Sequence, residues 1–263
     1  MIAFPLLLAV PLLMWIVQNV VLMANGMPVR LRIDARRAPT IVRVAGRITT
    51  QICLLTVILG YPVLSKRGGI LGFYQSLLPI GSDFVDFVRG AAAVVLCLST
   101  LYVIWILTER IDIKAHLSRK RCVRRLSMVI PTALFGAGVE ELVFRGVLMG
   151  DLFRTGLPPS LAIPVGTIVF AGAHYIRSVK RKWTFPGHLV LGVLLCLAFS
   201  LTRNLWLPYG LHAAGIFMIM GTRPFFWYKG PTWITGASIF PFAGLIGISG
   251  LGVLIAFVVQ HYR

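Results

Sequence analysis

The stretch FGAGVEELVFRGVLMG, Phe135 to Gly150, places two glutamates and one arginine inside an otherwise apolar run. A charged side chain near the middle of a bilayer costs at least about 2.5–3.5 kcal/mol on insertion scales. We therefore expect Glu140, Glu141 and Arg145 to pair with one another or to line a cavity. Ionisable groups inside a membrane segment indicate a functional site.

The composition indicates that this stretch lies in a membrane. Of the 263 residues, 57% are hydrophobic and only 13% are charged, whereas about 25% of the residues of soluble domains are charged. The net charge of +18 comes from Lys and Arg residues in short runs between apolar segments. Such runs are typical of topology signals and of contacts with anionic lipids, so no nucleic-acid partner is predicted. The sequence predicts an all-α, polytopic helix bundle, a multi-pass protein of the plasma membrane.

Eight apolar segments are near the length of about 17–25 residues that a membrane helix needs, so about eight transmembrane helices are predicted. Pro131 interrupts the fourth segment, and that helix is expected to kink or to start later. The first, third and fifth loops carry six, seven and four Lys or Arg residues, which places those loops in the cytoplasm and both termini outside. The whole chain is predicted to be one membrane domain, 1–263, with a catalytic core at about 127–220. The predicted spans are approximately 1–25, 49–65, 90–107, 127–153, 158–176, 186–201, 205–220 and 239–259.

Helical spacing separates the roles of the two adjacent glutamates. Neighbouring residues of an α-helix point about 100° apart, so Glu140 and Glu141 cannot face one cavity in the same way. Glu141 and Arg145 are spaced i, i+4 with the acid first, the favourable order for a pair on one helix face. We predict a structural ion pair between them. Glu140 then remains as the carboxylate that is available for chemistry.

Histidines interrupt the later apolar segments. His174 ends the run FAGAHY, His212 lies within LWLPYGLHAAGIF, and His188 is a further candidate near the start of the sixth segment. A single membrane histidine is more often a hydrogen-bonding group between helices than a catalyst. A carboxylate combined with two imidazoles, however, can activate water and stabilise an oxyanion, which is the chemistry of hydrolysis. The other histidines, His116 and His261, are expected to be solvated.

Three motifs in this order resemble those of a known family, the CAAX protease and bacteriocin-processing family of intramembrane glutamic endopeptidases, which includes the type II CAAX prenyl proteases. EELVFR, from Glu140 to Arg145, resembles the family's EExxxR motif, and FAGAH, ending at His174, resembles its FxxxH motif. The segment around His212 is similar to the third motif, a histidine followed four residues later by Asn or a related polar residue. The resemblance covers about 131–217, a third of the chain.

The resemblance implies a fold and a set of roles. It implies about eight helices around a conical cavity, metal-independent chemistry, activation of water by Glu140 and His174, and stabilisation of the oxyanion by His212. Ile216 stands where the third motif has Asn, and its side chain cannot donate a hydrogen bond. Because losing one oxyanion donor costs roughly 10²–10³ in rate, either another group takes its place or this protein works differently or is not a catalyst. Asn204, Tyr209 or a backbone amide are the candidates.

These residues allow more than one function. The favoured one is an intramembrane endopeptidase that cleaves near the C-terminus of a membrane-associated or lipidated protein or peptide, with Glu141, Arg145 and Asn204 in supporting positions. The alternative is a non-catalytic membrane scaffold or bacteriocin-immunity protein of the same fold, which Ile216 favours. A transporter with Glu140 as a proton relay fits the motifs less well.

A zinc site is the main alternative to metal-independent hydrolysis. Glu140, His174 and His212 could supply three ligands and leave the fourth position to water. The chain has no HExxH motif, however, and it has no obvious carboxylates to orient such ligands. We therefore predict neither a metal nor another cofactor.

Overall fold

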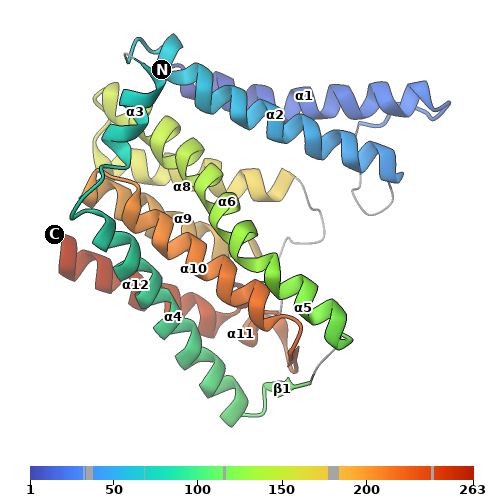
Figure 1. The fold of residues 1–263 in the computed structure, drawn as a ribbon, viewed down its shortest axis with the longest axis vertical. Coiled ribbons are helices and arrows are strands. Elements are labelled where there is room, and N and C mark those ends of the chain that lie inside the picture. Colours follow the sequence, from blue (N-terminus) through green and yellow to red (C-terminus); the bar gives the residue numbers. More distant parts are fainter. Residues whose placement is uncertain (32, 34–37, 68, 115–116, 177–183, 238–239) are drawn as a thin grey trace.

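The structure is a computed structural model of the chain (Figure 1). It describes residues 1–31, 33, 38–67, 69–114, 117–176, 184–237 and 240–263. His116 and the predicted start of the last span, Ile239, lie outside these residues. His261, also expected to be solvated, is exposed near the C-terminus.

Helices make up nearly all of the described secondary structure. They are α1 (Ala3–Ala24), α2 (Thr40–Leu64), α3 (Ile70–Leu77), α4 (Phe84–Leu107), α5 (Arg119–Ser127), α6 (Val129–Glu141), the π-helical η1 (Leu142–Met149), α7 (Gly150–Arg154), α8 (Pro159–Ile176), α9 (Phe185–Thr202), α10 (Trp206–Thr222), α11 (Thr232–Thr235), the 3₁₀ turn η3 (Pro241–Ala243) and α12 (Leu245–Tyr262).

The chain is a multi-pass, all-α membrane bundle, as predicted. Among the described residues, six helical segments are long and apolar enough to cross a membrane: α1, α2, α4, the segment Arg119–Arg154, α9 and α12. The apolar part of α8 and the 17 residues of α10 are shorter. The predicted count of about eight spans therefore stays a prediction.

Some helix boundaries differ from the predicted ones. Helix α2 begins at Thr40 and α4 at Phe84, each several residues before the predicted start, because polar residues flanking an apolar run can continue a helix beyond the membrane. The break expected near Pro131 falls at Met128, between α5 and α6. Proline has no N–H to donate to the carbonyl four residues earlier, here that of Ser127, so the regular ladder is interrupted there.

Helices α1 and α2 form an antiparallel arm that projects from the rest of the bundle (Figure 1). Apolar side chains such as Leu12, Val20, Ile48 and Leu59 are exposed along it, as expected for surfaces that face lipid. At its base, the buried carboxylate of Asp151 accepts hydrogen bonds from the backbone N–H groups of Ile2 at 2.6 Å and Ala3 at 2.9 Å. The first N–H groups of a helix have no partner within it, and an anion there also favours the helix dipole.

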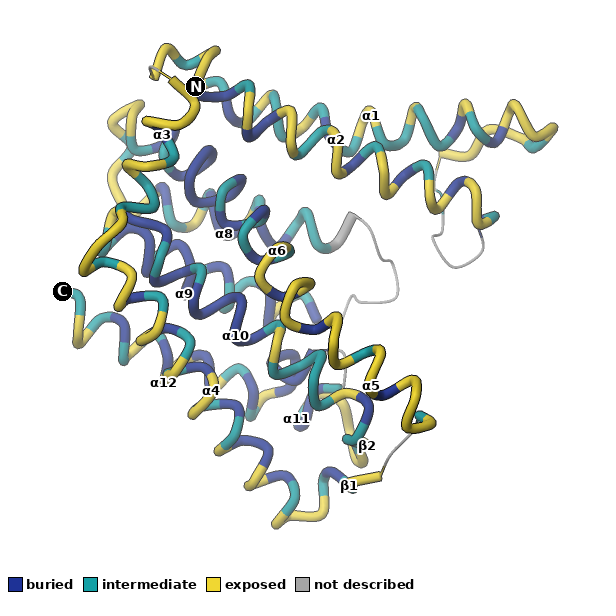
Figure 2. The backbone as a smooth tube through the Cα atoms, in the orientation of Figure 1, coloured by how far each residue is buried: buried dark blue, intermediate teal, exposed yellow. Residues whose placement is uncertain are grey.

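The centre of the bundle is formed by α9 and α10, in each of which about half of the residues are buried (Figure 2). Helix α10 crosses α4 at two glycines. A Cβ atom on Gly90 would lie 2.8 Å from the carbonyl oxygen of Leu207, and one on Gly210 would overlap the carbonyl of Phe87. Small residues at such crossings let two helix backbones approach closely.

A short antiparallel ribbon joins the ends of α4 and α10. Strand β1 (Ile111–Ile113) pairs with β2 (Phe226–Tyr228), with Asp112 opposite Trp227. The Asp112 carboxylate lies 2.6 Å from the Lys229 ammonium and 3.4 Å from that of Lys114. The hydrogen bond and the charge of Lys229 lower the pKa of Asp112 below its ordinary value. Three-residue strands carry too little periodicity for the sequence to predict them.

Candidate active site

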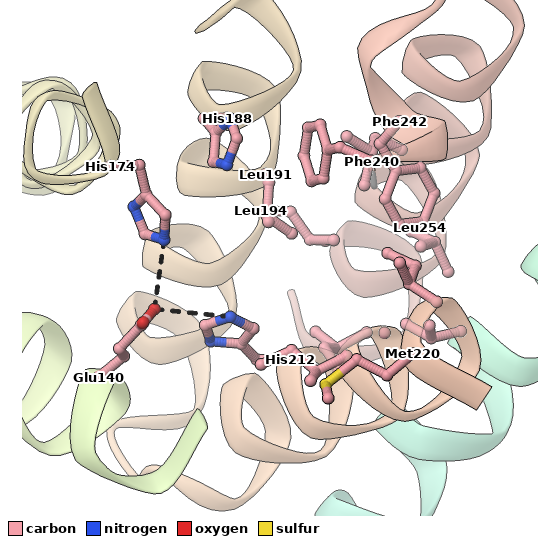
Figure 3. Close-up of a pocket in the computed structure, with 16 residues that line it drawn as sticks. Glu140, His174, His188, Leu191, Leu194, His212, Met220, Phe240, Phe242 and Leu254 are labelled. Carbon is pink, nitrogen blue, oxygen red and sulfur yellow. Dashed lines mark ion pairs between the residues drawn. The ribbon is translucent and has the colours of Figure 1, made fainter. Parts of the chain in front are cut away.

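A cavity of about 190 Å³ lies between α9, α10 and α12 (Figure 3). Its polar side chains are Glu140, His174, His188 and His212, and the rest of its wall is mainly hydrocarbon. The apolar wall includes Leu191, Leu194, Ile216, Ile219, Leu251 and Leu254. Because an apolar wall lowers the local dielectric, hydrogen bonds between these polar side chains and a bound molecule would be stronger here than in water.

Three helices bring the predicted catalytic residues together. Glu140 lies in the last turn of α6, His174 on α8 and His212 on α10. Glu140 Oε2 is 3.5 Å from Nε2 of His174 and 3.7 Å from Nε2 of His212. The Glu140 side chain as a whole is 32% exposed, whereas its Oε2 atom is buried. The carboxylate thus lies between two imidazoles at the edge of the cavity, as Figure 3 shows.

The position of the proton on His174 follows from its other contact. Nδ1 lies 2.9 Å from the carbonyl oxygen of Phe170, one turn earlier on α8. Because a carbonyl oxygen only accepts, Nδ1 must donate. Nε2 is then the nitrogen that exchanges protons or hydrogen bonds with Glu140.

Glu141, the next residue of α6, contacts two groups. Its Oε1 accepts a hydrogen bond from Arg145 Nη1 at 3.0 Å and another from His212 Nδ1 at 2.7 Å. The ion pair with Arg145 is the one expected from the i, i+4 spacing. The contact with His212 was not predicted, because sequence spacing carries no information on which residue of a distant helix faces Glu141. His212 therefore lies between two carboxylates, Glu141 at Nδ1 and Glu140 near Nε2.

Arg145 belongs to the π-helical segment that follows Glu141. The backbone of such a segment is hydrogen-bonded i to i+5, and single π turns occur often at functional sites. The Arg145 side chain is fully buried, and its guanidinium carbon lies 4.4 Å above the centre of the Phe170 ring. A cation on an aromatic face is stabilised by the ring's charge distribution. Arg145 thereby also holds Phe170, which contacts both site histidines.

The structure does not bring Asn204 to the cavity. The Asn204 Oδ1 atom accepts a hydrogen bond from the backbone N–H of Trp206 at 3.0 Å and so caps the start of α10. Six residues separate Trp206 from His212, about 9 Å along the helix axis. The Asn204 side chain therefore satisfies the first N–H group of α10, which has no partner within the helix.

The other suggested substitute for the missing Asn is also engaged elsewhere. The Tyr209 hydroxyl donates to the carbonyl of Leu134 on α6 at 3.1 Å, and Tyr209 is not among the residues that line the cavity. Ile216 does line it. The position one turn after His212 therefore presents hydrocarbon to the site, as the sequence indicated.

Within the described residues, no three His, Cys, Asp or Glu side chains are grouped so that they could hold a metal ion. The two imidazoles instead approach the Glu140 carboxylate.

The comparisons with known proteins bear on this same region. Residues 123–218 match the family model "Type II CAAX prenyl endopeptidase Rce1-like". This region is similar to that family. The resemblance predicted from the three motifs is thereby confirmed. Neither the comparison with curated proteins nor that with solved structures returns a match.

The Rce1-like region runs from α5 into α10 and contains Glu140, His174, His212 and Ile216. The family's name describes an endopeptidase. Together with the apolar helices, the match supports a protease-type protein in a multi-pass membrane setting. The arm of α1 and α2, and α12 at the C-terminus, lie outside the matched residues.

Proposed function

We propose that the protein is an intramembrane endopeptidase that hydrolyses a peptide bond with water activated by Glu140 and His174. The observation that carries the proposal is the position of Glu140 Oε2, within 3.7 Å of Nε2 of both histidines at the edge of an apolar cavity. A base with an adjacent imidazole can remove a proton from water, and a further imidazole can stabilise the resulting oxyanion.

The reaction proceeds in two steps. In the first, the water oxygen forms a bond to the carbonyl carbon, the C=O electron pair moves onto the carbonyl oxygen, and the water proton passes to Glu140, assisted by His174. In the second, the C=O bond re-forms, the C–N bond breaks, and the proton moves from Glu140 to the leaving nitrogen. The products are a new carboxyl terminus and a new amino terminus. Glu140 acts first as base and then as acid.

His212 is assigned to the oxyanion. Its Nδ1–H is held by Glu141, so a proton on Nε2 would point toward the region beside Glu140 where the tetrahedral oxygen would form. Carboxylates that bind the far nitrogen of a catalytic imidazole fix its orientation and stabilise its charged form. Glu141 then has two roles, as partner of Arg145 and as positioning residue for His212.

The substrate proposed is a membrane-associated or lipidated protein or peptide, cleaved near its C-terminus. The catalytic core, about 127–220, lies within a single membrane domain of the plasma membrane. The basic loops would contact anionic lipids, and no nucleic-acid role is proposed.

Ile216 is the observation that favours a second function. In a non-catalytic scaffold or bacteriocin-immunity protein, the cavity would bind a peptide without hydrolysing it, and the missing donor would not matter. Such a protein would retain its biological function when Glu140 is replaced by Gln.

The decisive comparison uses purified wild-type protein and Glu140→Gln in nanodiscs. Each is incubated with a membrane-proteome extract, with and without a zinc chelator, and new C-termini are mapped by mass spectrometry. We expect new termini with the wild type alone, unaffected by the chelator. Identical maps for both proteins would overturn the protease proposal, and loss of cleavage with the chelator would overturn the metal-independent mechanism.

A further inference from the structure

We propose that His188 is a positioning residue for His174. The His188 ring lies in the middle of a three-ring stack, between Phe240 and His174, and holds the His174 imidazole against Glu140. The inference rests on the proposed function only in the role it gives His174; the stack itself is a property of the fold. His174 and His212 both lie within ion-pair distance of the Glu140 carboxylate. His188 is the remaining polar side chain that lines the cavity.

The rings of Phe240, His188 and His174 lie one after another along the cavity wall. The Phe240 and His188 centroids are 4.2 Å apart, with ring planes inclined by 13°. The His188 and His174 centroids are 4.8 Å apart and inclined by 34°. Figure 3 shows His188 beside His174, with Phe240 beyond it. The stack therefore runs from the segment before α12, across α9, to the catalytic histidine on α8.

His188 is itself held firmly. It is 8% exposed, and its Nδ1 donates to the carbonyl of Thr184 at 2.9 Å. The residue before it is Gly187, where a Cβ atom would lie 2.7 Å from Cε1 of Phe240. The absence of a side chain at Gly187 is what allows the Phe240 ring to lie flat on His188.

The His174 ring has a second aromatic neighbour. Phe170, on the same helix, has its ring centroid 4.6 Å from that of His174. His174 thus contacts both Phe170 and His188, and its Nδ1 is fixed by the Phe170 carbonyl. These three contacts leave its Nε2 directed at the Glu140 carboxylate 3.5 Å away.

The geometry favours packing over proton exchange between the two imidazoles. The His174 and His188 rings are tilted by 34° with centroids 4.8 Å apart. Both nitrogens of His174 already have partners, Nδ1 at the Phe170 carbonyl and Nε2 at Glu140, so the contact with His188 is one of ring packing. An aromatic ring of similar size should therefore replace His188, and an aliphatic side chain should not. Misplacement of a catalytic group by about 1 Å can reduce rate roughly 100-fold.

The kinetic test compares His188→Phe, His188→Leu and the control His261→Leu in nanodiscs, with a peptide substrate taken from the wild-type cleavage map. His261 is matched because its Nδ1 also contacts the carbonyl one turn earlier, that of Phe257, at 2.9 Å, although the residue is exposed. We expect kcat to fall about 10- to 100-fold in His188→Leu with little change in KM. His188→Phe should keep at least about a third of kcat and the wild-type pH profile, and the control should match the wild type. Equal losses in the Phe and Leu variants, or an altered pH profile in His188→Phe, would overturn the stacking role.

A second measurement does not depend on protease activity. The chain has five histidines, so nitrogen-15 labelling of histidine gives a spectrum simple enough to assign by single substitutions. We expect the ring signals of His174 to shift or broaden in His188→Leu and to remain close to wild type in His188→Phe. Unchanged His174 signals in His188→Leu would overturn the proposal even if the protein cleaves peptides. If the His174 signals shift in His188→Leu but the wild type cleaves no peptide, the stack is supported and only the proposed function is overturned.

Discussion

Replacement of Glu141 by Gln tests whether this residue is more than the partner of Arg145. Glu141 is 1% exposed, and one oxygen serves both Arg145 at 3.0 Å and His212 at 2.7 Å. The sequence alone predicts mainly a loss of stability or yield, because removal of one partner of a buried ion pair costs about 3–5 kcal/mol. The contact with His212 adds a second effect. Loss of the carboxylate that orients a catalytic histidine reduces kcat by up to roughly 10⁴-fold.

The assay measures kcat per folded molecule and the free energy of unfolding for wild type, Glu141→Gln and a control. Asp151→Asn is a suitable control, since the Asp151 carboxylate is also buried and is paired with Arg154 at 2.7 Å, but it does not contact the cavity residues. We expect both variants to lose stability and only Glu141→Gln to lose at least about 100-fold in kcat. Wild-type kcat in folded Glu141→Gln would refute the positioning of His212 by Glu141.

Three further outcomes follow from other parts of the structure. Ile216→Asn places a hydrogen-bond donor in the cavity one turn after His212. We expect kcat to rise, by at most the roughly 10²–10³-fold that one oxyanion donor supplies. A lower kcat in a folded variant would contradict the need for a donor at this position. Gly210→Ala should prevent the close crossing of α4 and α10 and lower thermal stability, whereas Gly136→Ala, where a Cβ has open space, should not; similar melting curves for the two variants would contradict the crossing. Because folding lowers the pKa of Asp112, the Asp112 carboxylate stabilises the fold at pH values above its ordinary pKa, and this stabilisation is lost as the pH falls through the lowered pKa. Asp112→Asn should therefore reduce the dependence of the melting temperature on pH in the acid range. An unchanged pH dependence would count against the contact with Lys229.

Much of the architecture could be predicted from hydropathy, because the cost of exposing backbone and charge to lipid restricts a spanning segment to an apolar helix. The i, i+4 spacing of Glu141 and Arg145 was also sufficient to predict their pair, since it depends on one helix alone. Boundaries were less well predicted, as at Thr40 and Phe84, where polar residues continue a helix beyond the apolar run. The roles of the site residues stay predictions until the variants are measured.

Contacts between distant helices could not be predicted in the same way. The approach of His212 to Glu141, and the stack of Phe240 on His188, depend on how α6, α9, α10 and the segment before α12 rotate against one another. The sequence pointed to Asn204 as a donor because it precedes the third motif, but its position at the start of α10 directs it to capping. Only the three-dimensional packing distinguishes these uses of a polar residue.

The pair of Glu141 and Arg145 has a consequence for the biogenesis of the protein. Helix α6 is synthesised before α10, so His212 does not yet exist when Glu141 is added to the chain. The partner available before α10 is made is Arg145, which belongs to the same emerging segment and neutralises the carboxylate on insertion. When α10 packs against α6, Glu141 is already paired with Arg145, and His212 then donates a hydrogen bond to the same carboxylate oxygen.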